Sequence, residues 1–119
     1  MENSEELKNL FIIVNAGFAD DVLELTRAVG VTGATILNAR GYGAFHKSFL
    51  GIVVEPEKEV ILCITDKATA DKAMDVVTEQ AGVKTPAHGI CFTIPIDKVA
   101  GINLALSYET DVETEGSAD

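Results

Sequence analysis

The fold of this chain is constrained most by the order of its apolar segments, in which two helical stripes alternate with short runs typical of strands. From Phe18 to Val29 the apolar residues recur mainly at spacings of three and four, which predicts a helix. A second stripe predicts a helix over Ala68 to Ala81, with Asp66 placed to cap its first turn. A glycine, Gly30 or Gly82, follows each stripe, as is usual where helices end.

Strands are predicted where apolar and β-branched residues run together before, between and after these helices. The predicted strands are Leu10 to Asn15, Ala34 to Arg40, Val60 to Thr65 and Ile90 to Ile96, and Leu50 to Glu55 is expected to be extended. Pro56-Glu57-Lys58 predicts a turn, and a short turn of helix is expected around Asp97 to Ala100.

The resulting order, βαββαβ, is that of the ferredoxin-like α+β fold, in which an antiparallel sheet carries two helices on one face. The strands are nearly continuous in apolar residues, and two helices are too few to cover both faces of such a sheet. We therefore expect partner subunits to cover the second face, so that the chain forms a homo-oligomer.

Composition limits the classes of function that are possible. The chain has 119 residues, enough for one domain, and its net charge of −10 argues against nucleic-acid binding. The charge is concentrated at the ends, so we expect an acidic extension over residues 1–9, a folded domain over 10–106 and a disordered acidic tail over 107–119. No apolar run has the length of a membrane helix, and Cys63 and Cys91 form no disulfide framework, which predicts a reduced, cytoplasmic protein.

Four short motifs, in the right order, resemble PII signal-transduction proteins. Gly30-Val31-Thr32-Gly33-Ala34-Thr35 and then Arg40-Gly41-Tyr42-Gly43 resemble the family pattern G-x-x-G-x-T followed by [KR]-G-[FY]-G. Glu59 to Thr65 is similar to the family's third strand. Thr85 to Phe92 is similar to the family's loop and strand T-G-x-x-G-D-G-K-I-F, and Pro95 to Ile102 is similar to its C-terminal strand and turn. The resemblance implies a compact trimer that binds a nucleotide in the clefts between its subunits and regulates a partner.

An adenine nucleotide (AMP, ADP or ATP) is the effector that the resemblance implies, and a membrane transporter or an enzyme is the implied target. The candidate nucleotide-binding residues are Ile13, Thr35, Gly41, Tyr42, Gly43, Ile64, Ala87, His88 and Gly89. The family's long loop between the second and third strands is represented by a short candidate partner-contact loop of Ala44, Phe45, His46, Lys47, Ser48 and Phe49. Two phenylalanines beside a basic pair are costly to expose, which is compatible with a contact surface and equally with both phenylalanines folding back onto the sheet.

Several phosphate ligands of the family are replaced in this sequence. Ile90, Gly101 and Asn103 stand where the family has a lysine and two arginines. Ala44 and Phe45 stand where it has an arginine and a glutamine. Since charge-assisted hydrogen bonds are the strong ones, we expect AMP to bind at least as well as ATP.

Other functions stay open when the residues are considered alone. Gly41-Tyr42-Gly43 is compatible with a phosphate-binding loop and with a simple turn. His88 is compatible with a ligand donor and with an exposed loop residue.

A ferredoxin-fold trimer of the CutA type, for metal tolerance, is one alternative, and a trimer that binds no nucleotide is another. The available metal ligands lack metal-binding spacing, so no metal site is expected; they are His46, His88, Cys63 and Cys91. The acids between Glu55 and Glu59 have no histidine or nucleophile beside them, so no enzyme activity is expected.

Overall fold

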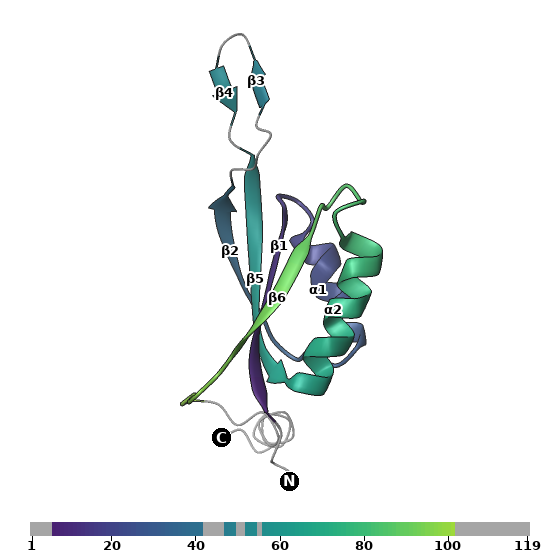
Figure 1. Cartoon of the computed structure of the whole chain (residues 1–119), viewed down its shortest axis with the longest axis vertical. Helices are drawn as coiled ribbons and strands as arrows, with labels where there is room; N and C mark the ends of the chain where they lie inside the picture. The colour runs from purple at the N-terminus through teal and green to yellow at the C-terminus, as the bar shows by residue number, and fades with distance from the viewer. Residues whose placement is uncertain (1–5, 42–46, 50–51, 55, 102–119) are drawn as a thin grey trace, which may run out of the picture.

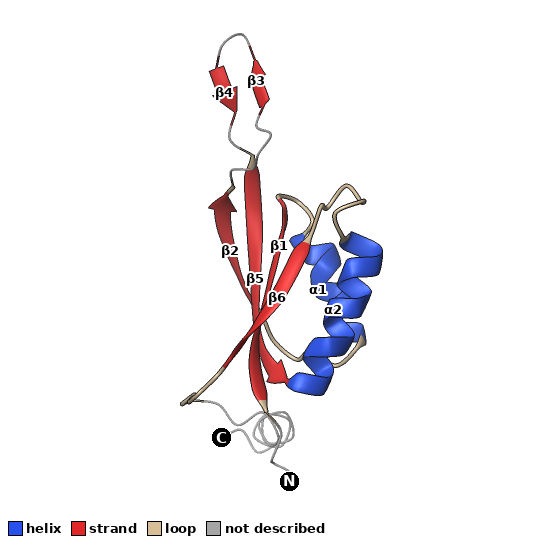
Figure 2. Ribbon diagram, in the orientation of Figure 1, coloured by secondary structure: helices blue, strands red, loops and turns tan. Residues whose placement is uncertain are grey.

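The computed structural model describes residues 6–41, 47–49, 52–54 and 56–101 (Figure 1). A four-stranded antiparallel sheet carries two helices on one face (Figure 2). The strands are β1 (Leu7–Asn15), β2 (Thr35–Arg40), β5 (Glu57–Asp66) and β6 (Ile90–Pro95), in the spatial order β2-β5-β1-β6. The helices are α1 (Ala19–Ala28) and α2 (Lys67–Ala81). This arrangement confirms the predicted ferredoxin-like α+β fold.

The core lies between the helices and the two central strands, whose side chains alternate between the two faces of the sheet. Leu10, Ile12 and Val14 of β1 are fully buried. In β5, Ile61 is fully buried and Cys63 is 1% exposed. The helices complete this core with the small or β-branched residues Ala19, Val22, Ala73, Val77 and Ala81. Small side chains on α2 let its backbone approach the sheet closely.

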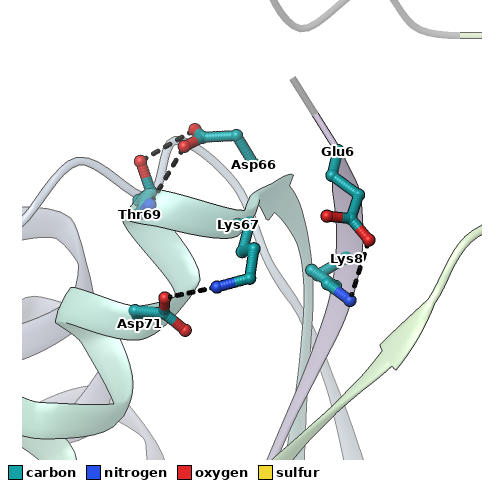
Figure 3. A network of polar contacts seen from close by, with 6 residues as sticks. All are labelled: Glu6, Lys8, Asp66, Lys67, Thr69 and Asp71. Atoms are coloured by element: carbon teal, nitrogen blue, oxygen red, sulfur yellow. Dashed lines mark hydrogen bonds and ion pairs between the residues drawn. The ribbon is translucent and has the colours of Figure 1, made fainter. Parts of the chain in front are cut away.

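The first turn of α2 is held by side-chain contacts that Figure 3 shows. The carboxylate of Asp66 accepts hydrogen bonds from the backbone N–H of Thr69 at 3.0 Å and from the Thr69 hydroxyl at 2.8 Å. Asp66 is therefore the N-cap, as predicted. Lys67 and Asp71 form an ion pair one turn apart at 3.0 Å, and the backbone N–H of Lys67 donates to the carbonyl of Glu6, which joins α2 to the start of β1.

Three local predictions are corrected by the structure. The first strand begins at Leu7 and not at Leu10. Glu57 and Lys58 belong to β5 and not to a turn, because they pair across the sheet with Arg40 and Ala39. The segment 97–100 contains a bend at residue 97 and no helical turn.

The connection between β2 and β5 is a hairpin, formed by β3 (Lys47–Phe49) and β4 (Ile52–Val54). It projects beyond the end of the main sheet at the top of Figure 1. At its base the N–H of Gly41 donates to the carbonyl of Pro56 at 3.1 Å. The predicted contact loop is thus partly a strand, since Lys47, Ser48 and Phe49 pair with β4; residues 42–46 lie outside the described residues.

The face of the sheet opposite the helices is apolar, and we call it the open face. Its apolar residues are Phe11 and Ile13 of β1, Leu37 of β2, Val60, Leu62 and Ile64 of β5, and Ile90, Phe92 and Ile94 of β6. Ile90 is 51% exposed and Leu37 47%. The rings of Phe11 and Phe92 stack here with centroids 5.1 Å apart. Asn9 also lies on this face, and its Oδ1 is buried without a hydrogen-bond partner in the described part of the chain.

Candidate functional site

Several of the predicted site residues meet at the end of the sheet where the hairpin emerges. β1 and β2 finish there, while β5 and β6 begin there, because neighbouring strands run antiparallel. Gly41 follows β2, and the loop of residues 82–89 precedes β6. Ile13 pairs with Ile90, the first residue of β6, so it lies on the open face beside this loop. The structure therefore places Ile13, Gly41 and the segment 87–89 at the same end of the sheet, with β5 and β1 between Gly41 and the loop.

Asn15, the last residue of β1, connects the loop of residues 82–89 to β5. Its backbone N–H donates to the carbonyl of Ala87 at 2.9 Å, and its Nδ2 donates to the carbonyl of Pro86 at 2.9 Å. Its Oδ1 accepts a hydrogen bond from Nζ of Lys58 at 2.7 Å. One amide side chain thus fixes both the loop and the position of a lysine ammonium.

The lysine also passes close to Gly41. A Cβ built on Gly41 would lie 3.1 Å from Cε of Lys58, so a larger residue at this position would displace the lysine side chain. Beside it lies a hollow of about 480 Å³, lined by Ala16, Asn38, Ala39, Arg40, Glu57, Lys58 and Glu59. Four of these residues, Asn38, Arg40, Glu57 and Glu59, lie on the helix side of the sheet by the strand register, so the hollow does not belong to the open face alone.

The loop of residues 82–89 is held tightly against α2 and β1. The N–H of Gly89 donates to the carbonyl of Ala81 at 2.7 Å, and the N–H of His88 donates to the carbonyl of Thr85 at 3.0 Å. His88 has a φ of 52°, and its Nδ1 lies 3.0 Å from the carbonyl oxygen of Val83. Because a carbonyl only accepts, Nδ1 carries the proton, and Nε2 is the nitrogen that faces other partners when the ring is neutral.

The N-terminus of α1 lies at the same end but is already occupied by a carboxylate. Oε1 of Glu59 accepts hydrogen bonds from the backbone N–H groups of Gly17 at 2.9 Å and Ala19 at 3.0 Å. Amides in the first turn of a helix are ordinary anion ligands. Since Glu59 already takes two of the amides at this terminus, a ligand phosphate at this end of the sheet needs a different cation or donor.

Two predicted residues lie at the other end of the open face. Thr35 pairs with Leu62 and is five residues from Arg40 along β2, or about 17 Å at the usual strand rise. Ile64 pairs with Asn9, also far from the loop. One chain does not bring these two residues to Gly41 and Gly89. Tyr42, Gly43, Ala44, Phe45 and His46 lie outside the described residues.

Sequence reasoning missed Asn15, Lys58 and Glu59. Their contacts join residues 40 or more positions apart, through the pairing of β1 with β5. The one local signal was that polar Asn15 ends an otherwise apolar run. Lys58 and Glu59 give no such signal, because Pro56-Glu57-Lys58 has the composition of a turn.

The two cysteines are poor candidates for chemistry. Burial raises the pKa of the Cys63 thiol to about 11. Burial also raises the pKa of Cys91, against a smaller opposing effect of its hydrogen bond with Thr78. Both thiols therefore stay protonated near neutral pH, whereas metals and electrophiles react with thiolates. Within the described ranges no group of three or more His, Cys, Asp or Glu side chains is placed to hold a metal ion.

Comparison with known families identifies the chain. Residues 7–104 match the family described as nitrogen regulatory protein P-II. The chain belongs to the P-II family. A comparison with curated proteins gives no significant match.

P-II structures share this fold. A PII-like signalling protein of Thermus thermophilus has a TM-score of 0.60 at 18% identity, over 77% of this chain and 88% of that one. The GlnK–ATP complex of B. subtilis has a TM-score of 0.59 at 17% identity, over 77% of this chain and 84% of that one. B. subtilis GlnK has a TM-score of 0.58 at 18% identity, over 77% and 86%. Among the described residues of this P-II protein, no helix is both long and apolar enough to cross a membrane.

Proposed function

We propose that this P-II protein is a homotrimeric sensor that binds an adenine nucleotide between its subunits and regulates a partner without catalysing a reaction. The observation that carries the proposal is the division of the predicted effector residues into two groups. Ile13, Gly41 and Gly89 lie at one end of the open face, and Thr35 and Ile64 lie toward the other. A neighbouring subunit that covers the open face would supply the second group to the first.

The open face itself supports the assembly. It is a broad apolar surface, of which Ile90, Phe92 and Ile94 are each more than 40% exposed. Apolar surface contributes about 25 cal/mol per Å² when it is removed from water.

An adenine nucleotide is the effector that fits the family and the site best. The GlnK of B. subtilis has been solved as an ATP complex, and this chain shares its fold. Ile13 offers an apolar surface to a purine beside a loop held by Gly89. We place the protein in the cytoplasm and propose a membrane transporter or an enzyme as the regulated target, with the hairpin as the contacting element because it projects from the sheet (Figure 1).

A thermal-shift panel tests this proposal. AMP, ADP, ATP, cyclic AMP and 2-oxoglutarate are each added to the purified chain, with zinc and copper as the metal arm. A ligand that binds the native state raises the free energy of unfolding by about 2.7 kcal/mol at a hundred times its Kd. We expect stabilisation by at least one adenine nucleotide. Stabilisation by metal alone would support the CutA-type alternative, and no shift in any arm would contradict nucleotide sensing.

A further inference from the structure

We infer that a hollow in the helix layer, between α1, α2 and the loop of residues 82–89, binds a small organic cation, namely an ammonium group on a short apolar chain. The hollow has a volume of about 220 Å³. Its lining includes Phe18, Asp21 and Leu25 from α1 and its N-cap, Gln80 from the end of α2, and Pro86 from the loop. The helices cover one face of the sheet (Figure 2), so the hollow lies away from the open face that we assign to assembly. This inference goes beyond the proposed function and does not depend on nucleotide binding.

The walls of the hollow are mostly apolar and suit a short hydrocarbon chain. Phe18 and Leu25 are partly buried against the core and also line the hollow. The buried residues Ala81 and Ala87 line it as well, and their small side chains leave the space open. Pockets for drug-sized ligands usually have a volume of about 300 Å³ or more. A hollow of about 220 Å³ therefore fits a ligand of few heavy atoms and is too small for a nucleotide.

The carboxylate of Asp21, in the first turn of α1, gives the hollow its charge. A side chain at this position can accept a hydrogen bond from the N–H of the N-cap residue. Here the N–H of the N-cap, Phe18, donates instead to the carbonyl of Asn15 at 3.3 Å. Within the described residues, Asp21 forms neither a hydrogen bond nor an ion pair. A carboxylate without a partner at the edge of an apolar wall suits a cation whose stem packs on that wall, as lysine side chains do on protein surfaces.

Other classes of ligand fit the hollow less well. An anion would meet Asp20, Asp21 and Glu24 on α1 and a net charge of −10, and the N-terminus of α1 is already occupied by Glu59. A neutral apolar molecule would remove water from the Asp21 carboxylate without pairing with it. A metal ion is unsuited too, because the described part of the chain has no group of three or more His, Cys, Asp or Glu side chains placed to hold one.

A titration with three four-carbon probes tests the inference. The full wild-type chain, labelled with ¹⁵N, is titrated at pH 7 and fixed ionic strength with n-butylamine, 1-butanol and butyrate, and the amide chemical shifts are followed. We expect saturable shifts at the amides of Asp21 and Ala87. The Kd for the amine should be about two- to fivefold lower than that for the alcohol, as a partly exposed ion pair would give. Butyrate should bind more weakly than the alcohol.

Neighbouring residues provide matched controls. Asp21→Asn should remove the preference for the amine. Asp20→Asn should keep it, because Asp20 loses the same charge in the same turn but does not line the hollow. Gln80→Lys should repel the amine, whereas Glu79→Gln, which changes the charge equally on the adjacent residue, should not. This second pair serves if Asp21→Asn melts below the wild type.

The contradicting results are specific. An equal Kd for amine and alcohol in the wild type, or loss of the preference in Asp20→Asn and not in Asp21→Asn, would overturn the inference. So would the absence of saturable shifts with the amine, and if a lysine-containing peptide then shifted the same amides, the hollow would be a protein contact instead. AMP binding, measured separately, should be the same in Asp21→Asn and the wild type. A failure of amine binding therefore leaves nucleotide sensing intact, and a failure of AMP binding leaves this inference intact.

Discussion

The N–H of Gly89 donates a hydrogen bond of 2.7 Å to the carbonyl oxygen of Ala81, and this contact joins the loop before β6 directly to the end of α2. The approach is so close that a Cβ on Gly89 would lie 2.4 Å from the same oxygen and 3.2 Å from Cγ1 of Val14. Both neighbours are fixed, one as helix backbone and one as a fully buried side chain. A residue other than glycine at position 89 must therefore displace the loop.

Gly89→Ala tests this contact. We expect the free energy of unfolding to fall by about 1–3 kcal/mol, the usual cost of forcing extra atoms into a packed site, and nucleotide binding to be lost. Urea denaturation and calorimetry measure the two effects. Gly33→Ala is the control, because nothing lies within 4 Å of a Cβ there. Equal stability of the two variants would show that the loop relaxes freely.

The cap of α2 predicts a dependence of stability on pH. Partial burial acts to raise the pKa of Asp66, but hydrogen bonds from the backbone and side chain of Thr69, with smaller ones from the backbone of Asp66 and Ala68, outweigh it and lower the pKa. A carboxyl whose pKa is lower in the folded state stabilises the fold above its unfolded pKa, about 3.9. This contribution is lost as the pH falls through the folded value.

Asp66→Asn isolates that charge, since asparagine caps helices about as well as aspartate. The wild-type chain should be more stable than the variant at pH 7, and the difference in the free energy of unfolding should shrink below about pH 4. Urea denaturation of both proteins between pH 3 and pH 7 provides the measurement. A difference that stays constant over this range would mean that the Asp66 carboxylate contributes no charge-dependent stability.

Local patterns were sufficient for most of the fold and for little of the site. The helical stripes placed α1 and α2 to within a residue or two, because burial on one face imposes a period on the sequence. The apolar runs placed β6 to within one residue and β1 apart from its first three residues. The start of β5 was misjudged because Pro56-Glu57-Lys58 has the composition of a turn, whereas pairing of Glu57 with Arg40 makes it a strand. Such pairing is a long-range effect that a short window does not contain.

Long-range pairing, which a short sequence window does not contain, determines even more of the site than of the fold. Gly89 could be identified as a special position, because its motif resembles that of a known family. The contacts of Asn15, Lys58 and Glu59 could not be identified, since they depend on the register between β1 and β5 and on the position of α1. The separation of Thr35 from Gly41 also requires the strand register, and it is this separation that suggests a site shared between subunits.

Assembly through the open face predicts the effect of a charge placed there. Phe92 is 41% exposed and stacks on Phe11, so it lies within the apolar surface. Phe92→Asp should convert the trimer to single chains, because the carboxylate would be buried without a partner in the interface. Light scattering should give a mass of three times 12.6 kDa for the wild type and a mass of 12.6 kDa, that of one chain, for the variant.

Val83→Asp provides the control for this assembly experiment. Val83 is 54% exposed but belongs to the loop and not to the open face, so its substitution should leave the trimer intact. Circular dichroism confirms that both variants are folded. A wild-type mass of a single chain or a stable dimer would exclude the proposed interface.

The charge of the ligand gives a further prediction. The resemblance to the family's motifs predicts that Ile90 and Gly101 replace cationic phosphate ligands, so AMP should bind as tightly as ATP or more tightly, with little effect of Mg²⁺. The net charge of −10 further disfavours a polyanion. Competition of both nucleotides at fixed ionic strength, with and without Mg²⁺, measures this. Submicromolar, Mg²⁺-dependent ATP binding would show that other residues supply the missing phosphate contacts.

The central claim, that the effector binds between subunits, is tested most directly by mixing two defective variants. Thr35→Val and Gly89→Ala each damage one of the two groups of residues that we assign to the cleft. Each variant alone should bind AMP poorly, because all its clefts are defective. In a trimer that contains both, one cleft combines the intact Gly89 of one subunit with the intact Thr35 of its neighbour, so the co-expressed mixture should regain AMP binding in calorimetry. Absence of any recovery in verified mixed trimers would contradict a site shared between subunits.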